Sequence, residues 1–174
     1  FHDKIAGFTN RFSYGNYSLS FHIDGKFGGK LYSQTNRWAV SAGKHPMTLE
    51  GRDAGIIGKG VTEEGKENDV LVTPDKISSY YSRLTTIHEA FVYDASFIKF
   101  RELALNWKIP SKAYNKTFLT DATVSFVARN LFYLMKKVEN VSPESSVSSS
   151  NVQGLENAGY PETRTIGFNI NLTF

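Results

Sequence analysis

The last ten residues of the chain alternate without exception between apolar side chains and small or polar ones. They read Thr165-Ile166-Gly167-Phe168-Asn169-Ile170-Asn171-Leu172-Thr173-Phe174. Because successive side chains of a β-strand point to opposite faces, this segment predicts a strand with one apolar and one polar face. A tilted strand crosses a bilayer in about 9–11 residues, so the length suits a membrane strand. A strand of a soluble sandwich can alternate in the same way, and the rest of the chain has to separate the two.

The composition allows one ordinary domain and excludes several classes of protein. The 174 residues are 40% hydrophobic and 14% aromatic, and the mean hydropathy is −0.32. No run approaches the roughly 18–20 apolar residues of a spanning helix, whereas the alternating strands of a membrane barrel keep mean hydropathy low. The net charge of +3 comes from scattered basic residues, which does not make the basic stripe of a nucleic-acid-binding protein. The absence of Cys excludes disulfides and thiolate metal sites.

Two strands joined by a tight turn are predicted near the start of the chain. Residues 8–14 alternate, and Gly15-Asn16 is a two-residue hairpin signal. The next strand begins at Tyr17, and we expect it to continue through Gly25 to about Tyr32. The chain begins at Phe1 without a leader pattern, so we expect a piece of a longer protein or a removed leader.

Two further strands are predicted over residues 94–109 and 122–134. In the first, apolar residues occupy even positions up to Phe100 and odd positions from Leu103, so the alternation changes at Arg101-Glu102. This change predicts a β-bulge that leaves Phe100 and Leu103 on the same apolar face. In the second, Asn130 interrupts the apolar parity.

The connections between these strands alternate between short and long. Gly15-Asn16 and residues 110–120 are short, whereas residues 37–93 and 135–164 are long and lack a sustained period. Five antiparallel strands with this asymmetry are typical of outer-membrane barrels, which have short periplasmic turns and long extracellular loops. Within the first long loop a short helix is predicted from Pro74 to Leu84. The second loop has a serine run at residues 142–150 and is predicted to be flexible and solvated.

Four stretches in order resemble SusC/RagA-type TonB-linked outer-membrane transporters of Bacteroidetes. The end of the chain, residues 163–174, is similar to the family's C-terminal strand. Ala128-Arg129-Asn130-Leu131-Phe132 resembles the family's Gly-Arg-Asn-Leu-Phe strand, with Ala in place of Gly. Residues 96–103, continuing to Ile109-Pro110, resemble its penultimate-hairpin entry strand. Its long penultimate loop is similar to Gly58-Lys59-Gly60-Val61, Asn68 and Tyr80-Tyr81.

This resemblance implies a much larger protein than the chain itself. Family members have a plug domain, a TonB box and a barrel of roughly 22 strands. Residues 1–174 match only the C-terminal five strands, which form an all-β, antiparallel part of the barrel. The resemblance implies active import of glycans or peptides through the bacterial outer membrane, with a SusD-like surface lipoprotein and TonB as partners. The remaining barrel strands and the outer-membrane lipid would contact this segment, with the long loops extracellular and the C-terminus periplasmic.

The sequence predicts neither catalysis nor a cofactor. The four His residues have no metal-ligand spacing, and no nucleophile elbow or HExxH motif occurs. By resemblance, the terminal strand is the signal read by the assembly machinery, through Phe168, Ile170, Leu172 and Phe174. Loop aromatics could stack on sugar rings or contact a partner, or they could pack within the loop; they are Trp38, Tyr80, Tyr81 and Tyr93.

Three functions remain open from the sequence. The first is the importer, the second is a passive or non-transporting outer-membrane barrel such as a porin or adhesin, and the third is a soluble β-sandwich binding module. The identity of the substrate and the oligomeric state have no signal in these residues.

Overall fold

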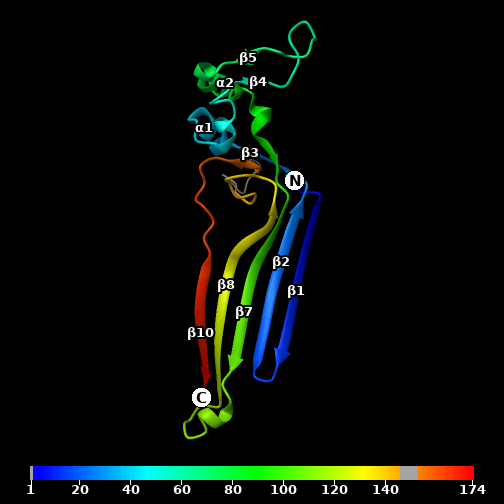
Figure 1. The fold of residues 1–174 in the computed structure, drawn as a ribbon. Coiled ribbons are helices and arrows are strands. Elements are labelled where there is room, and N and C mark those ends of the chain that lie inside the picture. Colours follow the sequence, from blue (N-terminus) through cyan, green and yellow to red (C-terminus); the bar gives the residue numbers. More distant parts are fainter. Residues whose placement is uncertain (1, 146–152) are drawn as a thin grey trace. The chain divides into compact units, whose positions relative to one another are not determined.

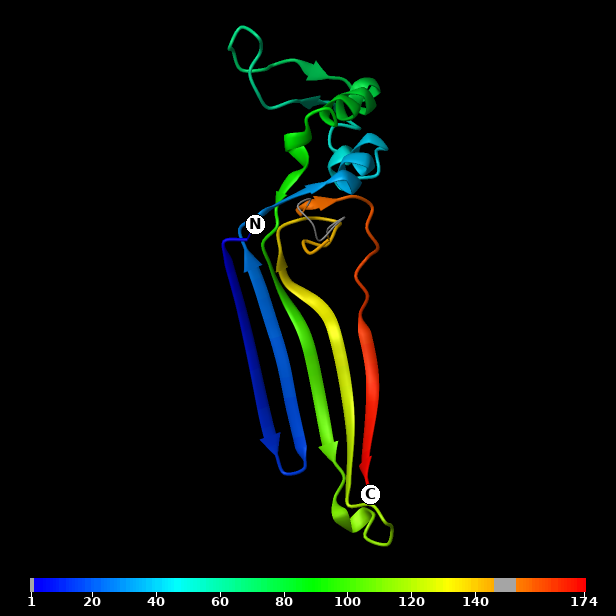
Figure 2. The same ribbon diagram turned by 180° about the vertical axis from the view of Figure 1, so that it is seen from behind.

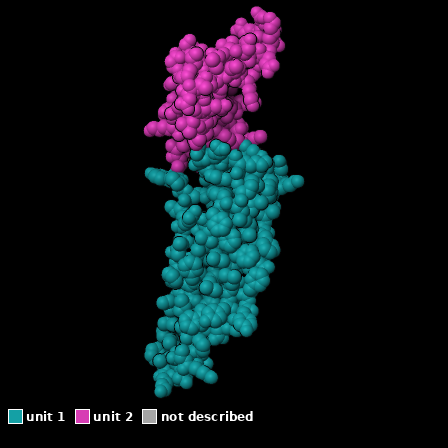
Figure 3. All heavy atoms as spheres, in the orientation of Figure 1, with its two compact units in different colours: residues 1–29, 94–144, 160–174 teal, residues 30–93, 145–159 magenta. Residues whose placement is uncertain are grey.

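A computed structural model describes residues 2–145 and 153–174 (Figure 1). The chain divides into two compact units, which are coloured separately in Figure 3. The first unit consists of residues 1–29, 94–144 and 160–174, and the second consists of residues 30–93 and 145–159. The serine run expected to be solvated lies mostly outside the described residues, because it includes Ser146, Ser148, Ser149 and Ser150.

The first unit is an antiparallel sheet of five long strands, which Figure 2 shows from behind Figure 1. Its order is β1-β2-β7-β8-β10, so the five strands lie in the sheet in the same order as in the chain. A short 3₁₀ turn, Ser111–Ala113, lies in the connection from β7 to β8. The prediction of five antiparallel strands is confirmed. Their bounds are β1 Lys4–Tyr14, β2 Tyr17–Phe27, β7 Phe97–Lys108, β8 Asp121–Lys136 and β10 Thr165–Thr173.

The hairpin of β1 and β2 turns at Gly15-Asn16 as predicted, since Tyr14 pairs with Tyr17. The expectation that the second strand reaches Tyr32 is wrong. β2 passes through Gly25 but ends at Phe27, because Gly28 and Gly29 both have positive φ, of 73° and 77°. A Cβ on Gly28 would lie 2.2 Å from Asp3 Oδ2, so this left-handed turn needs glycine.

The predicted bulge in β7 is confirmed. Against β2, His22 pairs with Glu102 and Ile23 with Phe100, so Arg101 is the extra residue of β7. Against β8, Phe100 pairs with Phe132 and Glu102 with Arg129, so Arg101 lies opposite two residues and the extra residue is in β8. The register between β2 and β7 shifts at the same level, between His22 and Ile23. Asn130, which interrupts the apolar alternation of β8 in the sequence, lies at the same irregularity. Its positive φ of 54° interrupts the alternation of side chains along the strand.

The bulge keeps the apolar side chains of the sheet on one face. Phe21 stacks on Phe100, and Phe100 stacks on Phe132, with ring centroids 5.9 Å and 5.4 Å apart. Leu103 pairs with Phe21, so Leu103 and Phe100 share this face as predicted. Among the described residues no second sheet packs on it, and many of its side chains are exposed, including Phe12 at 56% and Phe168 at 77%. A soluble sandwich would cover such a face with a second sheet.

The second unit has its own small core. Val40, Ile77, Tyr81 and Phe91 are buried together and partly covered by neighbouring apolar side chains. The expected helix from Pro74 to Leu84 is present as a 3₁₀ turn, η2 Pro74–Lys76, followed by α2 Ile77–Leu84. A second helix was not predicted: α1 Gln34–Ser41 begins where the Ser33 side chain accepts a hydrogen bond from the backbone N–H of Asn36.

Short strands complete this unit, in a three-stranded sheet of order β6-β3-β9 and a two-stranded sheet of β4 and β5. None of the helices within the described residues combines the length and hydropathy that a membrane crossing requires. The remaining bounds are β3 Lys30–Ser33, η1 Pro46–Leu49, β4 Ile56–Ile57, β5 Leu71–Val72, η3 His88–Phe91, β6 Val92–Asp94 and β9 Leu155–Glu156.

Candidate functional site

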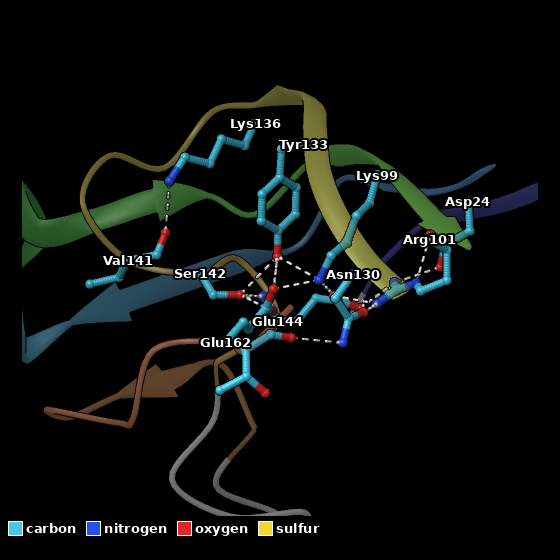
Figure 4. Close-up of polar contacts among 11 residues, drawn as sticks. Asp24, Lys99, Arg101, Asn130, Tyr133, Lys136, Val141, Ser142, Glu144 and Glu162 are labelled. Atoms are coloured by element: carbon cyan, nitrogen blue, oxygen red, sulfur yellow. Dashed lines mark hydrogen bonds and ion pairs between the residues drawn. The ribbon is translucent and has the colours of Figure 1, made fainter. Parts of the chain in front are cut away.

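A cluster of charged side chains lies on the polar face of the five-stranded sheet (Figure 4). The register of β2, β7 and β8 places Asp24 opposite Lys99, and Lys99 opposite Tyr133. Arg101, at the bulge, points to the same face and forms an ion pair with Asp24. The strands therefore bring two cations and one carboxylate together where the sheet is locally irregular.

Two carboxylates from the connection between β8 and β10 complete the cluster. Glu144 accepts hydrogen bonds from Arg101 through both oxygens, with N–O distances of 2.8 and 2.9 Å, and its Oε2 lies 3.1 Å from Lys99 Nζ. Glu162 forms a second ion pair with Lys99. The Lys99 side chain is only 2% exposed, so its ammonium is enclosed by these partners.

Hydroxyl groups satisfy the remaining acceptors of the cluster. Tyr133 Oη lies 2.9 Å from each oxygen of Glu162, and Ser142 Oγ lies 2.9 Å from Tyr133 Oη. Ser142 also donates to Glu162. The ammonium of Lys99 lies 4.7 Å from the centroid of the Tyr133 ring, at a distance suited to a cation–π contact.

Both loop carboxylates are held in the charged form. Burial on its own would raise the pKa of Glu144, but the hydrogen bonds from Arg101 and Lys99 outweigh it and lower that pKa below its ordinary value. The pKa of Glu162 is lowered in the same way, where burial is opposed chiefly by the hydrogen bonds from Lys99 and Ser142. These ion pairs are therefore fully formed at neutral pH.

The geometry of the cluster indicates an anchor, which ties both ends of the second long loop to the sheet. The expectation that this loop is simply solvated is wrong at Val138 and Glu156, which are 1% and 2% exposed, whereas residues 157–164 are exposed as expected. Glu156 accepts hydrogen bonds of 2.6 Å from the hydroxyls of both Ser33 and Thr35. In the sequence, Lys99 and Arg101 alternate with apolar residues, which indicates that they lie on a polar face. The sequence does not show which loop carboxylates pair with them, because the loops contain several.

The residues of the predicted assembly signal lie on the edge strand β10 and just beyond it. Phe168 pairs with Phe126, Ile170 with Val124 and Leu172 with Ala122, all on the apolar face. Phe174 follows the end of β10, where its ring stacks on Phe118 with centroids 5.4 Å apart. In the described part of the chain β10 pairs only with β8, and β1 only with β2, so both predicted edges of the sheet are open.

The four loop aromatics lie in the second unit, and three of them pack on its core. Tyr81 is buried and its hydroxyl donates to the carbonyl of Met47, over 2.7 Å. Tyr80 packs edge-on against Tyr81, and both Tyr80 and Tyr93 lie against the core. Trp38 on α1 is 51% exposed and keeps a free ring surface. Packing within the loop, the alternative left open above, thus describes the three tyrosines better than ligand stacking does.

Within residues 2–145 and 153–174 no group of three or more His, Asp or Glu side chains is arranged to hold a metal ion.

Comparison with known proteins gives relatives along almost the whole chain, although no protein-family model matches it. TonB-dependent receptor P26 of Formosa agariphila is 27% identical over 179 residues, which take in 99% of this chain and 17% of that protein. TonB-dependent receptor P3 of the same organism is 21% identical and is matched over 16% of its length. The chain therefore spans about a sixth of the curated relatives it matches.

Solved structures show the same fold. The RagAB peptide importer in its closed-closed state superimposes with a TM-score of 0.66 at 18% identity, over 98% of this chain and 17% of that one. The structure described as the RagAB peptide transporter gives 0.62 at 20% identity, over 97% and 17%. The open-edged antiparallel sheet, its exposed apolar face and these relatives agree with one another. Over nearly its whole length this chain is similar to a segment of TonB-dependent receptors, and it has the fold of a segment of the RagAB importer.

Proposed function

We propose that the chain forms the C-terminal strands of an outer-membrane importer that takes up peptides or glycans and is energised through TonB. The observation that carries this proposal is a sheet with an exposed apolar face and two open edges, β1 and β10. In hydrocarbon each unsatisfied backbone group costs several kcal/mol, so a spanning sheet has to close into a barrel.

Five strands cannot close on themselves. A barrel of about eight strands already has a lumen that its own side chains just fill. The polar face here carries the bulky cluster of Lys99, Arg101 and Tyr133, which needs a wider lumen. The free edges of β1 and β10 therefore pair with further strands of the same polypeptide, and β10 with the first strand of the barrel.

The second unit fits an extracellular loop that meets a partner protein. It exposes apolar side chains that a solvated loop does not need, among them Trp38, Leu49, Val61 and Leu71. We assign this surface to contact with a SusD-like lipoprotein, in line with the likeness to the two-component RagAB importer.

The substrate class is open between peptides and glycans. The RagAB structures are of a peptide importer, and this favours peptides. Uptake of labelled peptide and oligosaccharide pools by cells that express the full-length receptor would decide between them. We expect uptake of one pool to be lost both on deletion of the receptor gene and on deletion of tonB. Uptake that persists without TonB would show a passive barrel instead.

The topology has its own test, which is protease shaving of intact cells with the cuts mapped by mass. We expect cuts within residues 37–93 and none within residues 110–120, because only the former would lie outside the cell. Cuts confined to residues 110–120 would invert the orientation and contradict the assignment.

A further inference from the structure

The strands of the sheet supply more positive than negative charge to the cluster on their polar face. Lys99 and Arg101 lie on β7 and the carboxylate of Asp24 lies on β2, so the strands contribute two cations and one anion. The connection between β8 and β10 supplies the two remaining carboxylates, Glu144 and Glu162. The sheet by itself therefore presents a surplus of positive charge at this point, which residues of the loop neutralise.

The guanidinium of Arg101 is fixed by residues of the strands. Nε and Nη2 donate to the two carboxylate oxygens of Asp24 over 3.1 and 2.7 Å, and Nη1 donates to Oδ1 of Asn130 over 3.4 Å. An arginine has five N–H donors in a rigid plane, so these contacts leave one N–H on Nη1 and one on Nη2. Two such donors side by side form a fork that matches the two oxygens of a carboxylate.

Glu144 occupies this fork (Figure 4), and its two oxygens accept from Nη1 and Nη2 of Arg101 over 2.9 and 2.8 Å. The pair is partly open to solvent, because the Arg101 and Glu144 side chains are 27% and 20% exposed, whereas the neighbouring Lys99 is 2% exposed. Withdrawal of Glu144 would leave Lys99 paired with Glu162, so the fork can be vacated without leaving a buried charge unpaired. The strands thus hold a site for one carboxylate, and a side chain of the loop fills it.

We propose that the fork of Arg101 binds a carboxylate of the imported substrate, and that Glu144 occupies it as an internal competitor while no substrate is present. The proposal rests on the proposed import function, in which the polar face of the sheet lines the substrate path. The C-terminus of a peptide and a uronic acid both carry the carboxylate that this site recognises. Glu144 is the last residue of the first unit before the chain enters the second, so its displacement would free the chain from Arg101 at that point.

The test measures binding to the purified full-length receptor in detergent, which needs neither TonB nor uptake. The probes are N-trifluoroacetyl-alanyl-alanine as free acid and the same dipeptide as its amide, and broadening of their fluorine NMR signal reports binding. Glu144→Gln removes the competing charge and keeps the shape of the side chain. We expect the free acid to bind this variant about tenfold more tightly than the unmodified receptor, because one competing charge-assisted contact is lost. Binding of the amide should not change.

Glu162→Gln is the matched control, because it removes the same charge from the other loop carboxylate, which pairs with Lys99. Binding of the acid should stay within about a factor of two of the unmodified receptor, since the fork remains occupied. Arg101→Lys in the Glu144→Gln background keeps the positive charge but removes the fork, and it should abolish the gain.

Three results would overturn the site: no gain in Glu144→Gln, an equal gain in Glu162→Gln, which would reduce the effect to net charge, and an equal gain for the amide. Competition with glucuronic acid then separates the two sources of the carboxylate. Displacement of the fluorinated acid from Glu144→Gln supports the site with an acidic sugar as ligand, and the gain without displacement supports it with a peptide. TonB-dependent uptake without a gain in binding would overturn this site and leave the import function standing.

Discussion

Replacement of Lys99 by Met tests whether the ionic cluster anchors the second long loop. Methionine keeps most of the length of the side chain but removes the ammonium that pairs with Glu144 and Glu162. The loop would then be held by Arg101 and by the hydroxyls of Tyr133 and Ser142. We expect residues 137–145 and 153–164 to open more often, while the strands of the sheet keep their protection.

The magnitude follows from how deeply each partner is buried. An exposed ion pair contributes about 0–1 kcal/mol, whereas removal of one partner of a buried pair costs about 3–5 kcal/mol. Lys99 is 2% exposed, but Glu144 and Glu162 are 20% and 30% exposed and can regain water when the ammonium is removed. We therefore expect a loss of about 2 kcal/mol, which corresponds to roughly a thirty-fold larger open population.

Hydrogen exchange read by mass spectrometry on the full-length receptor measures this population. Lys108→Met is the matched control, because it breaks an exposed pair with Asp121 of 3.0 Å. This control should change exchange of the loop peptides by less than a factor of two. If Lys99→Met leaves residues 137–145 and 153–164 within a factor of two of the unmodified receptor, the anchoring role is refuted.

Three further predictions concern the same sheet and loop. Because the folded-state pKa values of Glu144 and Glu162 are lowered, their contribution to holding the loop is fully present above the ordinary value of 4.5 and lost as pH falls below it; the open population of the loop, taken from exchange rates corrected for the intrinsic rate at each pH, should rise in acid, and less so in Glu144→Gln. Asn130→Val should destabilise the folded barrel by about 1–2 kcal/mol in urea unfolding, because the left-handed φ of 54° disfavours a β-branched residue, whereas Asn130→Gly should cost less. Deletion of Phe174 should reduce assembled barrel in membrane fractions far more than Phe168→Leu does; equal levels would leave Phe174 with a packing role only.

Much of the sheet follows from local patterns in the chain. Alternation over residues 165–174 predicts β10 and its two faces, because the period of a strand is set by the backbone and needs no distant partner. The parity change at Arg101-Glu102 predicts the bulge for the same reason, and Gly15-Asn16 predicts the tight turn. The short α2 could be predicted from Pro74 and the residues after it. Each of these signals lies within a few residues of the structure it describes.

The polar face and the loop unit required contacts between residues far apart in the chain. Arg101 pairs with Asp24 and Glu144, 77 and 43 positions away, and Lys99 pairs with Glu162, 63 positions away. Charge alone does not choose among the carboxylates of a loop, because any of them satisfies the same cation until the backbone path is known. The burial of Tyr81 likewise arises from packing α1 against α2, where Val40 and Ile77 join it in one core. Local periodicity thus decides the strands and their faces, and tertiary packing decides which side chains meet across them.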